Sequence, residues 1–426
     1  MNHAFRALAA LLVASPLAAQ QQSVAIVGAT LHPVAGPVIE RGTIVLQGGK
    51  IVAIGANVPV PAGARVIEAA GKLVTPGFIH SETQIGLGVG RSLGKETDEE
   101  YAAIGGTTDD SKRGDINASF NPSEGLDPNA IAIPIARLGG VTTTVIVPGR
   151  SFIAGQVVAI DLSGNSMEEL LVGGPIAMAL RLNDGSREAG GGARAGATAR
   201  LRALLRDAAI YRTRKLQYES GAIRELAAPA AELAALLPVV DGVLPLYIEV
   251  DRQSDIQNAL RIAREFRLKI ILRSGKEAWT MAAELAKAGV STVLDAQHNL
   301  PSFDGLRTRW DNAALLREGG ARVILGGQDP GGQGNLRFEA GHAVRNGLSW
   351  TDALAAVTLE PARAFGLAAR YGSLEVGKVA NVVIWSADPF ETSSAAEHVF
   401  IRGNEMPQTN RQLELLRRYK TLPPTY

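Results

Sequence analysis

The chain has 426 residues, enough for one large domain with a smaller one beside it. Its 43 basic and 42 acidic side chains nearly cancel, which argues against a nucleic-acid or membrane-surface partner. It contains no cysteine, so disulfides and thiolate metal ligands are excluded.

The first nineteen residues have the pattern of a secretory signal. His3 and Arg6 give a weakly basic start, residues 7–14 form an apolar run too short to span a bilayer, and small residues end at Ala19. We predict a cleaved signal peptide over residues 1–19, and a periplasmic or secreted protein without a membrane span. A buried N-terminal helix is the alternative. No cysteine follows the signal, so we expect no lipid anchor.

Both ends of the remaining chain are rich in short β-branched runs broken by glycine and proline. We predict one composite β-sandwich domain from residues 20–75 and 368–426. Gly48 and Gly49 are typical of a hairpin turn. The predicted strands are 23–27, 43–47, 50–54, 65–68, 380–385 and 398–401.

The middle of the chain, residues 76–367, alternates buried-type strands with helical patterns. This alternation predicts an α/β domain with a parallel sheet, and a flexible Gly- and Arg-rich loop over 185–196. The predicted strands are 141–147, 157–162, 176–182, 244–250, 269–272, 290–294 and 322–325, and the predicted helices include 255–266, 278–288 and much of 200–237.

Residues 74–86 combine an apolar run, a turn at Pro76-Gly77 and an alternating strand pattern over 78–85. This stretch resembles the first barrel strand of the amidohydrolase superfamily. Residues 334–341, 348–363 and 372–389 are similar to the closing segments of its imidazolonepropionase-like and exported Xaa-Pro dipeptidase-like branch. The resemblance implies a (β/α)8 TIM-like barrel with a composite β-sandwich, and hydrolysis of C–N bonds in cyclic amides or dipeptides.

The resemblance also implies a metal site, usually zinc, with two histidines on strand one, a lysine or glutamate on strand four, a histidine on each of strands five and six, and an aspartate on strand eight. Here the strand-one positions are Glu82 and Gln84, and the strand-five position is Glu249. Strands four and six offer no such ligand, and strand eight keeps Asp329, which the resemblance makes catalytic. Imidazole is the ligand that suits zinc, so this set does not support zinc.

Two histidines near this site have open roles. His80 replaces the family's aspartate, and is either a shifted ligand or a structural polar contact. His298 follows strand seven, and is either a general base, a substrate contact or an ordinary loop histidine. We expect substrate specificity to lie in loops such as 91–115 and 185–196.

If Glu82, Glu249 and Asp329 converge, their charges repel unless a cation lies among them. The cation is Arg273 or Lys276, a weakly bound Mg²⁺ or Ca²⁺, or a cationic substrate. Two functions follow. One is a catalytically impaired protein that binds a small molecule or short peptide, or pairs with an intact paralogue. The alternative is an active hydrolase that uses Asp329 with an oxygen-ligand metal or none.

Overall fold

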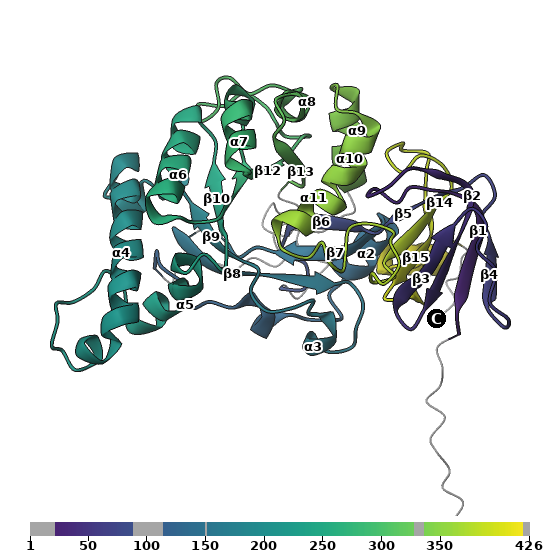
Figure 1. The fold of residues 1–426 in the computed structure, drawn as a ribbon, viewed down its shortest axis with the longest axis horizontal. Coiled ribbons are helices and arrows are strands. Elements are labelled where there is room, and N and C mark those ends of the chain that lie inside the picture. The colour runs from purple at the N-terminus through teal and green to yellow at the C-terminus, as the bar shows by residue number, and fades with distance from the viewer. Residues whose placement is uncertain (1–21, 88–113, 150, 328–335, 421–426) are drawn as a thin grey trace, which may run out of the picture.

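The computed structural model describes residues 22–87, 114–149, 151–327 and 336–420. Two sheets organise these residues, each with eight strands. One sheet curls into the barrel at the centre of Figure 1, and the other forms the β-rich part in purple and yellow beside it. The molecule is therefore an α/β TIM-like barrel with an additional β-rich domain, as the sequence predicts.

The barrel sheet follows the chain, with neighbouring strands in sequence order from β6 to β13. Ser81 donates a hydrogen bond to the carbonyl of Leu325 across the gap between the first and last strands, so the barrel is nearly closed. Most strands are buried on both faces, as expected for a sheet covered by helices. The strands are β6 (Phe78–Thr83), β7 (Val141–Ile146), β8 (Ile153–Asp161), β9 (Ala177–Arg181), β10 (Leu246–Val250), β11 (Ile270–Ser274), β12 (Ser291–Leu294) and β13 (Arg322–Leu325).

The third barrel strand departs from the predicted parallel arrangement. β8 pairs antiparallel with both β7 and β9, whereas the other barrel pairs are parallel. A parallel crossover needs roughly a dozen residues or more. Only residues 147–152 separate β7 from β8, so the chain reverses in a hairpin-like connection. The expectation of a wholly parallel sheet is therefore wrong at this strand.

Helices cover the outer face of the barrel (Figure 1). In α6, Ile256, Ala259 and Leu260 face the core, because apolar residues recur at helical spacing. Arg261, Arg264 and Glu265 of the same helix are exposed. The helices on and around the barrel are α2 (Ala132–Leu138), α3 (Met167–Leu170), α4 (Arg194–Glu219), α5 (Ala230–Val240), α6 (Gln253–Phe266), α7 (Ala282–Ala288), α8 (Asn312–Glu318), α9 (Leu336–Arg345), α10 (Trp350–Ala356) and α11 (Leu359–Ala364).

The second sheet combines strands from both ends of the chain, as the sequence predicts. The hydrogen bonds link all eight strands into one sheet that branches at β1, where β4 pairs beside β2 and β5. The strands are β1 (Val24–Leu31), β2 (Ile39–Gln47), β3 (Lys50–Gly55), β4 (Arg65–Glu68), β5 (Leu73–Pro76), β14 (Val382–Trp385), β15 (Ala396–Ile401) and β16 (Asn404–Glu405).

Trp385 joins the two parts. Its fully buried ring stacks on Phe78 of the first barrel strand, with centroids 5.2 Å apart, and its indole N–H donates to Thr75 at 2.9 Å. Gly140, before β7, has a positive φ of 78°, and a Cβ there would lie 2.3 Å from the Trp385 ring. The contact therefore requires glycine at this position.

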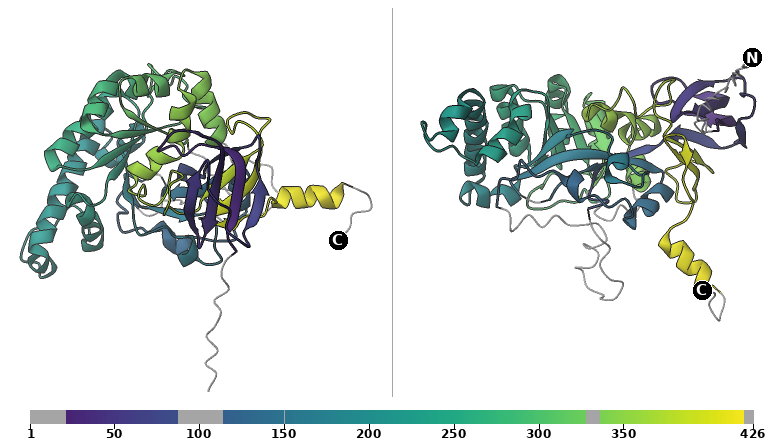
Figure 2. Two further views of the ribbon diagram at one scale, coloured as in Figure 1. Left: turned by 45° about the vertical axis from the view of Figure 1, so that its right-hand side comes forward. Right: turned by 90° about the horizontal axis from the view of Figure 1, so that it is seen from below.

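Helix α12 (Arg411–Tyr419) has no buried residue and extends away from the rest of the molecule (Figure 2). Among the described residues, no helix is both long and apolar enough to cross a membrane. The predicted signal, residues 1–19, lies outside the described residues.

Candidate functional site at the barrel mouth

A buried arginine lies at the centre of the barrel mouth. Arg273, on β11, binds Glu82 of β6 at 2.5 Å and also contacts a carboxylate oxygen of Glu249 on β10. The three side chains are 7, 9 and 10% exposed, respectively. The guanidinium is therefore a counter-ion shared by two largely buried carboxylates. Of the two counter-ions considered from the sequence, the structure brings Arg273 to this position and not Lys276.

Arg181 adds a second cation to Glu249. Arg181, Glu249 and Arg273 occupy matched positions on the adjacent parallel strands β9, β10 and β11, so their side chains meet on one face. The Arg181 guanidinium lies 3.1 Å from Glu249, and Asn183 donates to the same carboxylate at 2.6 Å. Burial alone would raise the pKa of Glu249, but Arg273 and Arg181 outweigh it and lower that pKa to about 2.

Sequence reasoning missed Arg181, since it considered only lysine and acidic ligands on strand four. The available signal was its position near the end of a buried strand, where Glu249 and Arg273 also lie on theirs.

Tyr247 is a further partner of Glu82. Its hydroxyl donates to Glu82 at 3.2 Å, and its ring lies 5.7 Å from the Arg273 guanidinium carbon. Burial and the nearby Glu82 carboxylate raise the pKa of Tyr247 well above its usual value, so the phenol stays protonated as the donor. For Arg273, the two carboxylates outweigh the effect of burial and raise the pKa.

His80 and Gln84 are placed differently from Glu82. His80 Nδ1 accepts a hydrogen bond from the backbone N–H of Glu82 at 3.3 Å, so this histidine makes a structural polar contact. Burial lowers the pKa of His80 to about 4. Gln84 lies just beyond β6 and donates to the carbonyl of Val147. Gln84 does not line the mouth cavity described next.

A polar cavity of about 390 Å³ opens above the Arg273 cluster. Asp251 accepts hydrogen bonds from Ser274 at 2.5 Å and Asn183 at 3.2 Å, and burial raises its pKa. Lys276 reaches Ser302 at 3.4 Å on another part of the rim. The lining of the cavity includes Glu82, Asn183, Glu249, Asp251, Arg273, Ser274, Lys276, Asp295, His298, Asn299 and Asp304.

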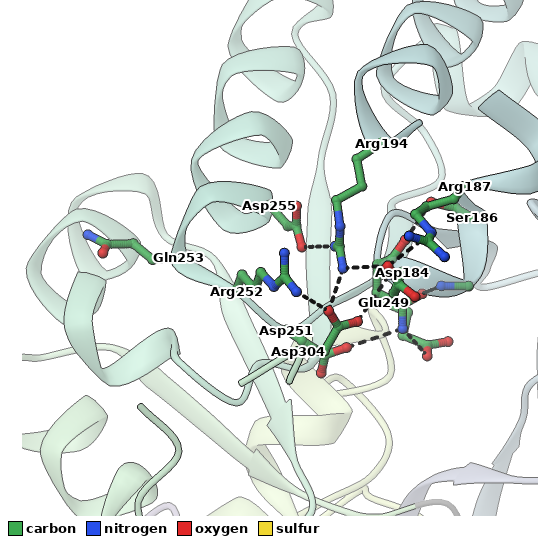
Figure 3. Close-up of polar contacts among 12 residues, drawn as sticks. Asp184, Ser186, Arg187, Arg194, Glu249, Asp251, Arg252, Gln253, Asp255 and Asp304 are labelled. Atoms are coloured by element: carbon green, nitrogen blue, oxygen red, sulfur yellow. Dashed lines mark hydrogen bonds and ion pairs between the residues drawn. The ribbon is translucent and has the colours of Figure 1, made fainter. Parts of the chain in front are cut away.

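The segment 185–196 is more structured than the predicted flexible loop. It contains two 3-10 turns, η3 (Asp184–Ser186) and η4 (Glu188–Gly190), and the first residues of α4. Arg194 lies at the centre of Figure 3 and binds Asp184 at 3.0 Å, Asp255 at 2.6 Å and also Asp304. These acids come from three segments, so Arg194 ties the segment to the rim of the cavity.

A second cluster lies between the ends of β12 and α9. Asp295 contacts His298 Nδ1 at 3.0 Å, and Glu339 accepts backbone hydrogen bonds from Ala296 at 2.7 Å and Gln297 at 3.1 Å. Burial and the adjacent Asp295 raise the pKa of Glu339 to about 8. Sequence reasoning singled out His298 but missed both acids. The spacing Asp295-x-x-His298 was visible, but the approach of Glu339 depends on the fold.

Asp329 and residues 91–113 of the predicted specificity loop lie outside the described residues. Convergence of Asp329 with Glu82 and Glu249 therefore stays a prediction. Within the described residues, one group of three His, Asp or Glu side chains is close enough to share a metal ion, and it is Asp295, His298 and Glu339.

The residues around Arg273 do not fit the zinc site that the fold family implies. Glu82 and Glu249 offer oxygen in place of imidazole, and their oxygens already bind guanidinium, tyrosine and asparagine donors. A cation entering between them would also meet the permanent positive charge of Arg273.

The comparisons with known proteins agree with this fold. Residues 253–406 match the Amidohydrolase family. Imidazolonepropionase of Acidiphilium cryptum (strain JF-5) is 27% identical over 382 residues, covering 83% of this chain and 89% of that protein. Imidazolonepropionase of Pseudomonas aeruginosa (strain UCBPP-PA14) is 32% identical over 177 residues, 39% of this chain, and the match spans only 40% of that protein's length.

Among solved structures, an amidohydrolase from Thermotoga maritima MSB8 superposes with a TM-score of 0.79 and 26% identity, covering 91% of this chain and 100% of that one. The family match, the relatives and this structure agree with the barrel and the composite sheet. The chain belongs to the amidohydrolase superfamily.

Proposed function

We propose that this chain is an exported amidohydrolase-fold protein that binds a small molecule or short peptide at the barrel mouth without the family's zinc chemistry. The observation that carries the proposal is Arg273, buried between Glu82 and Glu249. A fixed guanidinium supplies the positive charge that a metal ion supplies in the family, but it has no open coordination position at which to activate water.

Electrostatics supports a permanent arrangement. Removing one partner from a buried ion pair typically costs about 3–5 kcal/mol, because the other charge is left without compensation. Arg273 serves two carboxylates, and Glu249 is held further by Arg181. Displacing this guanidinium by a metal ion would break both contacts and place the ion beside the positive charge of Arg181.

The cavity above the cluster supports a binding role. At about 390 Å³ it is within the size range of small-ligand sites. The wall of the cavity includes an acidic side chain, Asp251, and a basic one, Lys276. Asn299 adds an amide group to the same wall. This lining suits a polar ligand with hydrogen-bonding groups at both ends. A role as partner subunit of an intact paralogue belongs to the same proposal.

The second candidate is hydrolysis of a C–N bond, and the names of the relatives favour it. In this version Asp329 acts as general acid/base, with an oxygen-ligand metal or none. Asp329→Asn would then abolish turnover, since removal of a general acid or base typically costs a factor of about 100 to 10,000. Unchanged turnover in that variant would remove Asp329 from the mechanism.

One experiment separates the two candidates. The purified chain is incubated with a panel of dipeptides and cyclic amides, with added Zn²⁺ or with EDTA. Hydrolysis is followed by mass spectrometry and binding by thermal shift. We expect stabilisation by some panel members and no turnover. Zinc-dependent turnover that Glu82→Gln abolishes would overturn the binding proposal.

A further inference from the structure

Asp295, His298 and Glu339 bring three metal-binding side chains together beyond the ends of β12 and β13. One donor atom from each lies within 4.8 Å of the other two. Asp295 and His298 follow β12, and Glu339 lies on the first turn of α9, after β13. The family's ligands come from strands one, four, five, six and eight, so this cluster is separate from that site.

Charge distinguishes this cluster from the acids around Arg273. In the described parts of the chain, no arginine or lysine forms a hydrogen bond or ion pair with Asp295 or Glu339. Glu339 is only 5% exposed, yet its carboxyl group lies against that of Asp295. Adjacent carboxyl groups repel each other when both are ionised, and a proton or a cation between them removes that repulsion.

The cluster is also accessible from solvent, and the chain leaves room for the Asp295 carboxylate. Asp295 and His298 line the mouth cavity, and the His298 side chain is 75% exposed, so an ion can reach the donors from solvent. A Cβ on Gly327 would lie 2.5 Å from an oxygen of Asp295. The absence of a side chain at Gly327 therefore leaves the room that this carboxylate occupies.

We propose that Asp295, His298 and Glu339 form a binding site for one divalent transition-metal ion at the barrel mouth. Two carboxylates and one imidazole suit such ions, with mixed oxygen and nitrogen ligands and open positions left for water. The hard ions Mg²⁺ and Ca²⁺ prefer oxygen ligands alone and should bind more weakly. The site would add a positive charge to the cavity wall, independent of the metal-free cluster around Arg273.

The test uses Mn²⁺, whose free form is counted directly by electron paramagnetic resonance. The full chain is dialysed against EDTA and then titrated with Mn²⁺. We expect one bound ion per chain. Loss of an outer-shell partner of a metal ligand typically weakens binding by about 10–100-fold. Glu339→Gln and His298→Ala remove ligands themselves, and should each weaken binding at least that much.

Two variants serve as matched controls. His342→Ala removes an imidazole one turn after Glu339, and Asp311→Asn removes a surface carboxylate that pairs with Arg309. Both should bind Mn²⁺ as the unchanged chain does. Circular dichroism checks that each variant is folded.

The outcomes separate this proposal from the proposed function. No binding at millimolar Mn²⁺, or binding that Glu339→Gln and His298→Ala leave unchanged, would overturn the second site and leave the binding proposal intact. Binding that disappears in Glu82→Gln instead would place the ion at the family position and overturn both.

Discussion

Replacing Arg273 with methionine is the most severe test of the cluster that Arg273 forms with Glu82 and Glu249. The substitution keeps much of the side-chain volume and removes the charge, so Glu82 and Glu249 remain buried and lose their shared counter-ion. Breaking a buried pair in this way costs about 3–5 kcal/mol, and we expect at least that loss in the free energy of unfolding. Urea denaturation at pH 7 measures it.

A double variant gives the decisive comparison. Arg273→Met combined with Glu82→Gln removes one charge of each sign and leaves Glu249 paired with Arg181, and replacing a buried ion pair by neutral groups is often nearly neutral in stability. We therefore expect the double variant to regain most of the lost stability. The reasoning is refuted if Arg273→Met costs less than about 1 kcal/mol, the range of an exposed pair, or if the double variant is no more stable than the single one.

Three further predictions concern pH, the junction and the rim. The pKa of Glu249 is lowered to about 2 and that of His80 to about 4, so each contributes stability above its unfolded pKa and loses it as pH falls through its folded pKa. For His80 this loss falls between pH 6.5 and 4, and for Glu249 between about 4.5 and 2. The raised pKa of Glu339, about 8, has the opposite effect over part of the first range, so the unchanged chain is compared with His80→Asn, which cannot titrate. Between pH 6.5 and 4 the unchanged chain should lose about 3 kcal/mol more in the free energy of unfolding than this variant; equal urea profiles would contradict this. Gly140→Ala should destabilise the chain by more than 1–2 kcal/mol through the clash with Trp385, measured by loss of the native Trp fluorescence in urea; an unchanged midpoint would show that the junction adapts. Arg194→Ala should speed limited proteolysis within residues 184–193, and unchanged cleavage would show that the ion pairs do not hold this segment.

The fold was largely predictable because its signals are local. Apolar runs bounded by glycine and proline marked the barrel strands, and the β-branched texture at both ends marked the composite sheet. The reversed direction of β8 was not predictable in this way, because periodicity does not encode strand direction. The short connection before Ile153 carried that information.

The site was predictable only in part. Strand alignment brought out Glu82, Glu249 and Arg273, and the argument from charge repulsion anticipated a counter-ion. The resemblance names Gln84 as the second strand-one position, but β6 pairs irregularly with β7 between His80 and Thr83, and Gln84 lies beyond the strand. The role of Glu339 could not be predicted from the sequence, because its partners are about forty positions away in the chain.

The most direct test of a metal-free barrel centre is an anomalous difference map at the zinc absorption edge, from crystals grown with Zn²⁺. We predict no peak between Glu82 and Glu249, with Arg273 still bound to both carboxylates. A peak within coordination distance of these two glutamates, with the Arg273 side chain displaced, would contradict the account.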